Sequence, residues 1–149
     1  MKKLIFLSLA TALFVACNNS PKTAEGNATV DSLEQDIEDG HIVGMGKMGA
    51  LIKAQNEAKR LLDSVSKLPA KAQQAAAPYT AKVENVLQDL SQADLLMNKW
   101  MEEYNMDSAK NNAEERIKYL VSEKGKIGQM NKAILGSLAK ADSILRKKL

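Results

Sequence analysis

Residues 112–147 read NAEERIKYLVSEKGKIGQMNKAILGSLAKADSILRK, and apolar side chains recur in this stretch at intervals of three and four. The recurring residues occupy heptad a and d positions: Ile117, Leu120, Ile127, Ile134, Leu138, Ala141 and Leu145. Lys124 and Asn131 interrupt the same seam, where polar residues more often set the register of packed helices than carry chemistry. Asn112 and Glu115 form a capping box at the start. The stretch therefore predicts a long amphipathic helix that buries one face.

Two earlier stretches carry the same helical period. In residues 31–67 an apolar stripe follows a run of acidic residues that suits a helix start, and Pro69 comes just after it. In residues 81–105 apolar side chains again fall mostly on one face. The Ala-rich residues 69–80, which contain two prolines, form either a helical turn or a loop. We therefore expect three helices, the third being residues 112–147.

Four glycines lie close together in the first expected helix, at Gly40, Gly44, Gly46 and Gly49. Each costs about 1 kcal/mol relative to alanine in a helix interior, so together they predict a kink or a break. The alternative is a notch at residues 40–49 that lets a helix of another envelope protein approach closely.

Length and composition fit one globular domain. The chain has 149 residues, of which 45% are apolar and 26% charged, and this is a globular rather than a disordered composition. No stretch alternates with period two, as a half-buried strand would. We therefore predict an all-α fold, an elongated antiparallel three-helix bundle that occupies residues 31–149.

The first residues read MKKLIFLSLATALFVACNNS, which is typical of a bacterial lipoprotein signal peptide. Lys2 and Lys3 precede an apolar run that is shorter than the roughly 20 residues needed to span a bilayer. The next residues, Phe14 to Cys17, resemble the lipobox of bacterial lipoproteins, in which signal peptidase II cuts before the cysteine. We expect residues 1–16 to be removed and Cys17 to be lipidated. The alternative is an ordinary signal peptide with a chance cysteine.

The expected lipid anchor sets the location of the domain. Several acyl chains on Cys17 give stable membrane anchoring, unlike a single chain. Residues 17–30 are polar, with Pro21 and Gly26, and predict a flexible tether. By analogy with the enterobacterial sorting rule, Asn18 in place of aspartate favours the outer membrane. We expect the domain to face the periplasm.

Charge and motifs narrow the function classes. The 21 basic and 18 acidic residues give a formal charge of +3, and the expected loss of Lys2 and Lys3 with the signal peptide brings the chain close to neutral. Few aromatic residues are available for base stacking, so we expect no nucleic-acid partner. His41 is the only histidine, and Glu38-x-x-His41 lacks the second copy that a di-iron bundle needs. Because no nucleophile elbow, phosphate-binding loop or HExxH motif occurs, we expect neither enzymatic activity nor a small-molecule substrate.

One cluster of residue types points to soft-metal chemistry. The candidate ligands, one imidazole and four thioethers, are His41, Met45, Met48, Met97 and Met101. Such ligands suit Cu(I) or Ag(I), and Trp100 would cover the ion through a cation–π contact. The alternative is that the methionines fill irregular gaps in the core. The sequence does not fix the register between the two helices that carry them.

Three short motifs occur in order within residues 40–145: His41 with Met45-Gly-Lys-Met48-Gly49, Ala93-Asp94 with Met97 and Trp100-Met101, and Tyr119-Leu120 with Glu123. On these motifs the chain resembles a group of small lipoproteins of Bacteroidetes-type bacteria, some of which carry the label "viral A-type inclusion protein". The resemblance implies no viral function, and no established activity or binding residue comes with it. This chain has Ile42 where the resemblance leads us to expect an acidic residue directly after the histidine.

The sequence thus predicts a lipid-anchored envelope protein with a non-enzymatic structural or protein-interaction role and no cofactor. Its expected contacts are the membrane, through the lipid on Cys17, and another envelope protein. The alternative is a periplasmic lipoprotein that binds Cu(I) or Ag(I) through the histidine and methionine cluster, with Trp100 as its lid.

Overall fold

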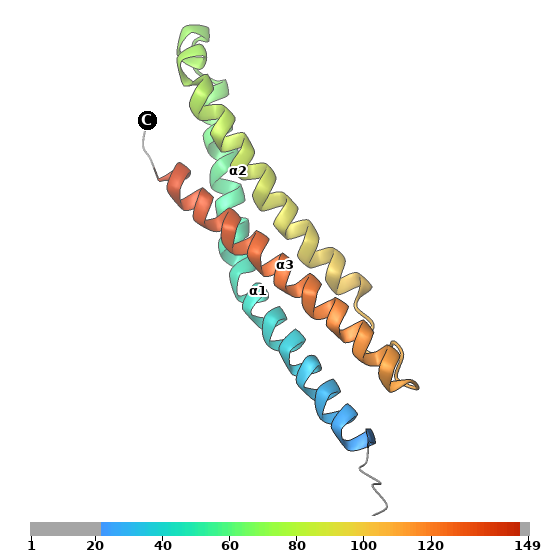
Figure 1. The fold of residues 1–149 in the computed structure, drawn as a ribbon. Coiled ribbons are helices and arrows are strands. Elements are labelled where there is room, and N and C mark those ends of the chain that lie inside the picture. Colours follow the sequence, from blue (N-terminus) through green and yellow to red (C-terminus); the bar gives the residue numbers. More distant parts are fainter. Residues whose placement is uncertain (1–21, 147–149) are drawn as a thin grey trace, which may run out of the picture.

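The structure, a computed structural model, describes residues 22–146 and is built from three α-helices. They are α1 (Lys22–Ser66), α2 (Ala70–Glu103) and α3 (Ala113–Leu145), and every pair of them is in contact. This confirms the predicted all-α three-helix bundle (Figure 1). The expected signal peptide, the lipidation site at Cys17 and the first part of the tether lie outside the described residues. Within the described part, none of the helices has the length and apolar character needed to cross a bilayer.

The helices run up, down and up along one rod (Figure 1). α1 and α3 are parallel, since Arg116 near the start of α3 pairs with Glu34 in the first half of α1, while Asn131 bonds the carbonyl oxygen of Gly40 farther along. α2 runs against both. The α1–α2 hairpin extends past the end of α3 at one tip, and the first turns of α1 extend past the start of α3 at the other (Figure 1).

Two helices begin earlier than the periodicity indicated. α1 starts at Lys22, so residues 22–30, expected in the tether, are helical, and Val30 at the end of this stretch packs against the core. α2 starts at Ala70 directly after Pro69 and continues through Pro78. The Ala-rich stretch that the sequence left open is therefore helix, because alanine has the highest helix propensity.

The buried face of the third helix is rotated away from the predicted seam, because of the a positions only Leu145 is buried. Its buried residues are Arg116, Leu120, Glu123, Ile127, Met130, Ile134, Ser137, Ala141 and Leu145. Most of these are d positions or the residues just before a positions. α3 packs against both α1 and α2, and the side chains around its d positions are the ones that contact the two helices. Lys124, an a position, is consequently exposed and pairs with Asp36 of α1 at 2.6 Å.

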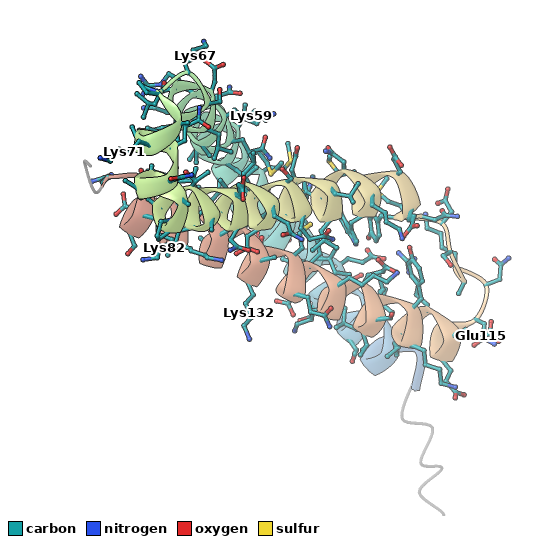
Figure 2. The ribbon with its side chains drawn as sticks, turned by 90° about the horizontal axis from the view of Figure 1, so that it is seen from above. Lys59, Lys67, Lys71, Lys82, Glu115 and Lys132 are labelled. Carbon is teal, nitrogen blue, oxygen red and sulfur yellow. The ribbon has the colours of Figure 1, made fainter. Side chains whose placement is uncertain are left out.

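The core between the helices is mostly aliphatic, with the thioethers of Met97 and Met130 and the indole of Trp100. Its largest fully buried side chains are Ile37, Leu51, Leu90, Met97, Leu120, Ile134, Val83 and Val86. Except for the buried Arg116 and Glu123, most charged side chains are on the outside of the rod. Figure 2 places Lys59, Lys67 and Lys71 around the α1–α2 turn, with Glu115 near the opposite end.

The glycines of α1 do not break the helix, so the expected break is wrong. Gly40 and Gly44 instead face the other helices, because a β-carbon at Gly44 would lie 2.5 Å from Cε of Met97 and 2.6 Å from Oδ1 of Asn131. Gly46 and Gly49 face open space. The close approach that the notch hypothesis assigned to a partner is thus made inside the bundle at two of the four glycines.

Candidate functional site

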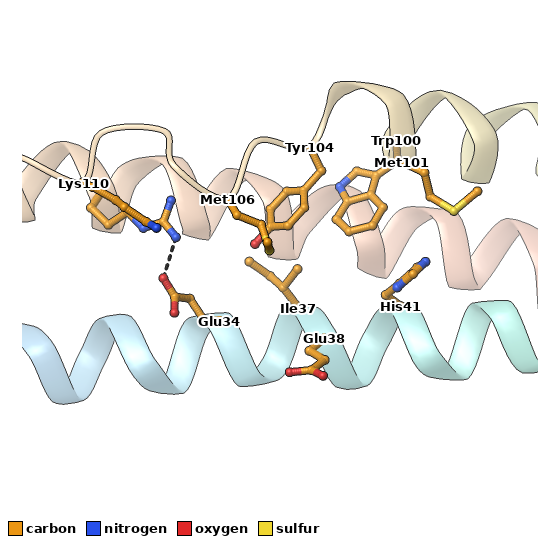
Figure 3. Close-up of a pocket in the computed structure, with 10 residues that line it drawn as sticks. Glu34, Ile37, Glu38, His41, Trp100, Met101, Tyr104, Met106 and Lys110 are labelled. Carbon is orange, nitrogen blue, oxygen red and sulfur yellow. Dashed lines mark hydrogen bonds and ion pairs between the residues drawn. The ribbon is translucent and has the colours of Figure 1, made fainter.

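A pocket of about 530 Å³ opens between α1, the end of α2 and the connection to α3 (Figure 3). It lies at the end of the rod opposite the hairpin tip. Its walls combine carboxylates, cations, aromatic rings and thioethers. The lining residues are Glu34, Ile37, Glu38, His41, Trp100, Met101, Tyr104, Met106, Lys110 and Arg116.

A column of aromatic rings forms one wall of the pocket. The ring of His41 lies 5.2 Å from that of Trp100 at an angle of 44°, and Trp100 stacks on Tyr104 at 4.7 Å and 20°. Tyr104 in turn stacks on Tyr119 of α3 at 6.2 Å and 11°. Burial raises the pKa of the Tyr104 hydroxyl above its ordinary value of 10.0. The indole ring is therefore held between two other rings and fixed in place.

A buried carboxylate orients Trp100. The indole Nε1–H donates a hydrogen bond of 2.9 Å to Oε2 of Glu123 in α3, and Glu123 is only 3% exposed. The other carboxylate oxygen accepts from Lys126 at 2.8 Å, and this bond raises the pKa of the lysine. Since a buried carboxylate is costly without partners, these two bonds make the position tolerable.

A buried guanidinium closes the pocket at its other end. Arg116 is 4% exposed and donates to Oε1 of Glu34 and, at 2.8 Å, to the carbonyl oxygen of Ser108. Its charge also lies 5.7 Å from the ring centre of Tyr119, a cation–π contact. These bonds tie α1 and the α2–α3 connection to the start of α3.

The connection itself is folded tightly over the pocket. Ala109 has a φ of 58°, a left-handed conformation that glycine adopts more easily. Asn112 caps α3 as predicted, accepting from the backbone N–H groups of Glu114 and Glu115. Lys110 donates to Asp107 at 2.5 Å and lowers the pKa of that carboxyl group.

Two buried polar atoms have no hydrogen-bond partner among the described residues, Nε2 of His41 and Oδ1 of Asn131. The Asn131 amide is still anchored, because its nitrogen donates to the carbonyl oxygen of Gly40 at 2.8 Å. His41 differs, because its ring is half-buried, lines the pocket and contacts the indole face. A buried polar atom without a partner is destabilising, so Nε2 is a position where a ligand gains binding free energy.

The structure brings together part of the predicted metal cluster. His41, Trp100 and Met101 line the same pocket, and Met45 follows His41 by one helical turn and is 42% exposed. Met45 is not among the lining residues, and neither are the last two candidates, because Met97 is fully buried in the core and Met48 packs against the core. Among residues 22–146, no three His, Cys, Asp or Glu side chains gather as a metal site.

Sequence reasoning missed the charged residues of the site, Glu34, Arg116 and Glu123. Arg116 and Glu123 lie seven residues apart in the predicted third helix, each directly before an a position of the heptad. A seven-residue repeat of charge beside an apolar seam was the available signal.

The arrangement is suited to binding. It offers an aromatic wall for stacking, an imidazole nitrogen without a hydrogen-bond partner among residues 22–146, and an ion pair at the far end. In comparisons with protein-family models, with curated proteins and with solved structures, this chain matched none.

Proposed function

We propose that this chain is a lipid-anchored binding protein of the bacterial envelope, without enzymatic activity, that stands on the outer membrane and faces the periplasm. Anchoring is supported by the basic residues, the short apolar run and the lipobox-like Phe14 to Cys17. The binding role is supported by the pocket at the end of the rod.

One observation carries the binding role, the unpartnered Nε2 of His41 beside a ring wall. A protein that served only as a spacer would gain stability by pairing this atom or replacing the residue, because a buried polar atom without a partner costs about 1–3 kcal/mol. The unpaired nitrogen therefore lowers the stability of the fold, and features that lower stability are typical of binding sites.

The pocket refines the broader interaction role expected from the sequence. It lies at the end of the rod where α1 begins, so a lipid at Cys17 would hold it near the bilayer surface. A protein partner in the envelope is compatible with this position, since the rim carries the exposed Met106.

The anchor is tested by cell fractionation and mass spectrometry of the N-terminal peptide. The wild-type chain is expected in the membrane fraction with acyl chains on Cys17. The Cys17→Ser variant, with the same folded domain, is expected to leave that fraction. An unmodified cysteine in the wild type, or a serine variant that stays membrane-bound, would overturn the anchor.

The binding role is tested on the lipidated chain extracted from the envelope, by native mass spectrometry. We expect one stoichiometric bound mass that the His41→Ala variant lacks. Leu135→Ala, which removes an exposed side chain outside the pocket lining, is the matched control and is expected to keep the mass. A chain that carries no bound mass, or a mass equally retained by His41→Ala, would contradict the binding role.

A further inference from the structure

We propose that the His41 end of the pocket is a site for a soft monovalent metal cation, Cu(I) or Ag(I), held by Nε2 of His41 and the thioethers of Met45 and Met101 beside the ring of Trp100. The inference deepens the proposed binding role and rests on it for the compartment. It drops Met48 and Met97 from the ligand set that the sequence suggested, because those two side chains belong to the core.

The register between α1 and α2 places the three ligands together. Gly44 lies opposite Met97, since a β-carbon there would meet Cε of Met97 at 2.5 Å. The helices are antiparallel, so one turn before Gly44 in α1 is level with one turn after Met97 in α2. His41 is therefore level with Trp100 and Met101, and the ring contact of 5.2 Å agrees.

Side-chain direction brings the sulfur atoms toward the same level. Long side chains on a helix lean toward its N-terminus. Met45, one turn after His41, therefore leans back toward the imidazole. Met101 leans along α2 toward the level of Gly44, and Figure 3 shows it pointing away from Tyr104 on the His41 side of the indole. The two thioethers thus converge on the space beside Nε2.

The three ligand groups are free to bind. Nε2 of His41 has no hydrogen-bond partner among residues 22–146. Met45 and Met101 are 42% and 40% exposed, so their thioethers are not committed to the core. Imidazole and thioether are the donors that Cu(I) and Ag(I) prefer over carboxylate or water, and Glu38 at the pocket edge adds a nearby negative charge.

Trp100 completes the site and reports on it. Tyr104 stacks on the indole at 4.7 Å, and the ring of His41 lies 5.2 Å from it at a tilt of 44°. A cation on Nε2 would therefore lie next to the indole, where the ring quadrupole attracts it. Trp100 is the only tryptophan of the chain, so its fluorescence reads this position alone.

The test is a titration of the lipidated chain in detergent with Ag(I) nitrate in chloride-free buffer, followed by Trp100 fluorescence and, for folding, circular dichroism. We expect saturable quenching at one equivalent. His41→Ala is expected to abolish it, and Met45→Leu and Met101→Leu, which conserve volume, each to weaken affinity about tenfold or more, as even outer-shell changes at metal sites do. Met48→Leu and Leu135→Ala, which both lie outside the pocket lining, are the matched controls and are expected to leave the titration unchanged.

Three results would overturn the site. They are a flat titration in a folded chain, quenching that His41→Ala retains, and an affinity that falls with Met48→Leu or Leu135→Ala but with neither Met45→Leu nor Met101→Leu. The Cys17→Ser variant separates this inference from the anchor, because it is expected to quench like the wild type. Loss of membrane association with intact quenching would then overturn the anchor alone. A flat titration of a chain that carries a bound organic mass would overturn the metal alone.

Discussion

A β-carbon added at Gly40 of α1 would lie 2.3 Å from Cγ2 of Ile127 in α3. Only a glycine leaves room for this approach of the two helices. At the same level, the Asn131 amide of α3 donates to the carbonyl oxygen of Gly40 at 2.8 Å. The contact therefore combines close packing with a side-chain bond to the backbone, and it fixes how α3 lies along α1.

The two kinds of glycine in α1 predict opposite effects of alanine. Gly40→Ala is expected to lower the free energy of unfolding by about 1–3 kcal/mol, because the new methyl group overlaps a buried, β-branched side chain. Gly46→Ala is expected to raise it by about 0.5–1 kcal/mol, because its site is open and alanine is less flexible in the unfolded chain. Urea unfolding followed by circular dichroism measures both, and equal signs would contradict the packing described.

Glu123 predicts a stability loss from deleting a buried acceptor. Glu123→Ala leaves the indole N–H of Trp100 buried without a partner, so we expect a loss of about 1–3 kcal/mol. In a chain that already carries Trp100→Phe, the donor is absent, so Glu123→Ala should lower the free energy of unfolding by less than it does in the wild type. Gln129→Ala, an exposed change on the same helix, is the control and should stay within about 0.5 kcal/mol. Additive losses in the double variant would show that the two residues are not coupled.

The Glu34–Arg116 pair predicts an unequal response to removing either partner. Glu34→Ala leaves a buried guanidinium without its anion and should cost about 2–3 kcal/mol, less than a fully buried pair because Glu34 is partly exposed. Arg116→Met leaves a carboxylate that can turn to water and the carbonyl oxygen of Ser108 without this donor, but no buried charge, so its loss should be smaller. The double variant should recover part of the Glu34→Ala loss. Thermal unfolding of the three variants ranks their stabilities. A larger loss of stability for Arg116→Met than for Glu34→Ala would contradict this argument.

The raised pKa values of Tyr104 and Lys126 predict weakening at alkaline pH. Both groups keep their protons longer in the folded chain than in the unfolded chain, whose ordinary values are 10.0 and 10.5. Their contribution is therefore complete below about pH 10 and is lost as the pH rises through the raised values. Urea midpoints measured between pH 8 and 11 should fall at the alkaline end. Tyr104→Phe should flatten this fall, and an unchanged slope would exclude the tyrosine as a cause.

The periodicity of apolar residues was enough to predict three helices and the bundle class. It was wrong at residues 22–30, where the apolar stripe is weak, and it left residues 69–80 open, where two prolines occur. Helix propensity and contact with a neighbouring helix decide such segments, and the contacts are not visible in one sequence. The same limit explains the glycines, because a break and a close helix contact give the same pattern.

The sequence predicted which types of residue form the candidate site, but only some of the predicted residues line the pocket. His41, Trp100 and Met101 share the pocket because the register places them level, and that register depends on Gly44 fitting under Met97. Met97 and Met101 differ by one turn and little in sequence context, yet one is fully buried and the other is 40% exposed. Such a difference comes from the third helix, whose position periodicity alone does not give.

Because the α1–α2 hairpin extends beyond α3, the pocket and the α1–α2 turn lie at different distances from the start of α1. The 45 residues of α1 rise about 68 Å along the helix axis. In a chain held by lipid at its N-terminus, the pocket then stays near the bilayer, where small solutes diffuse in. The turn between Ser66 and Ala70, ringed by lysines, becomes the outermost part and is the first region that a large envelope component meets.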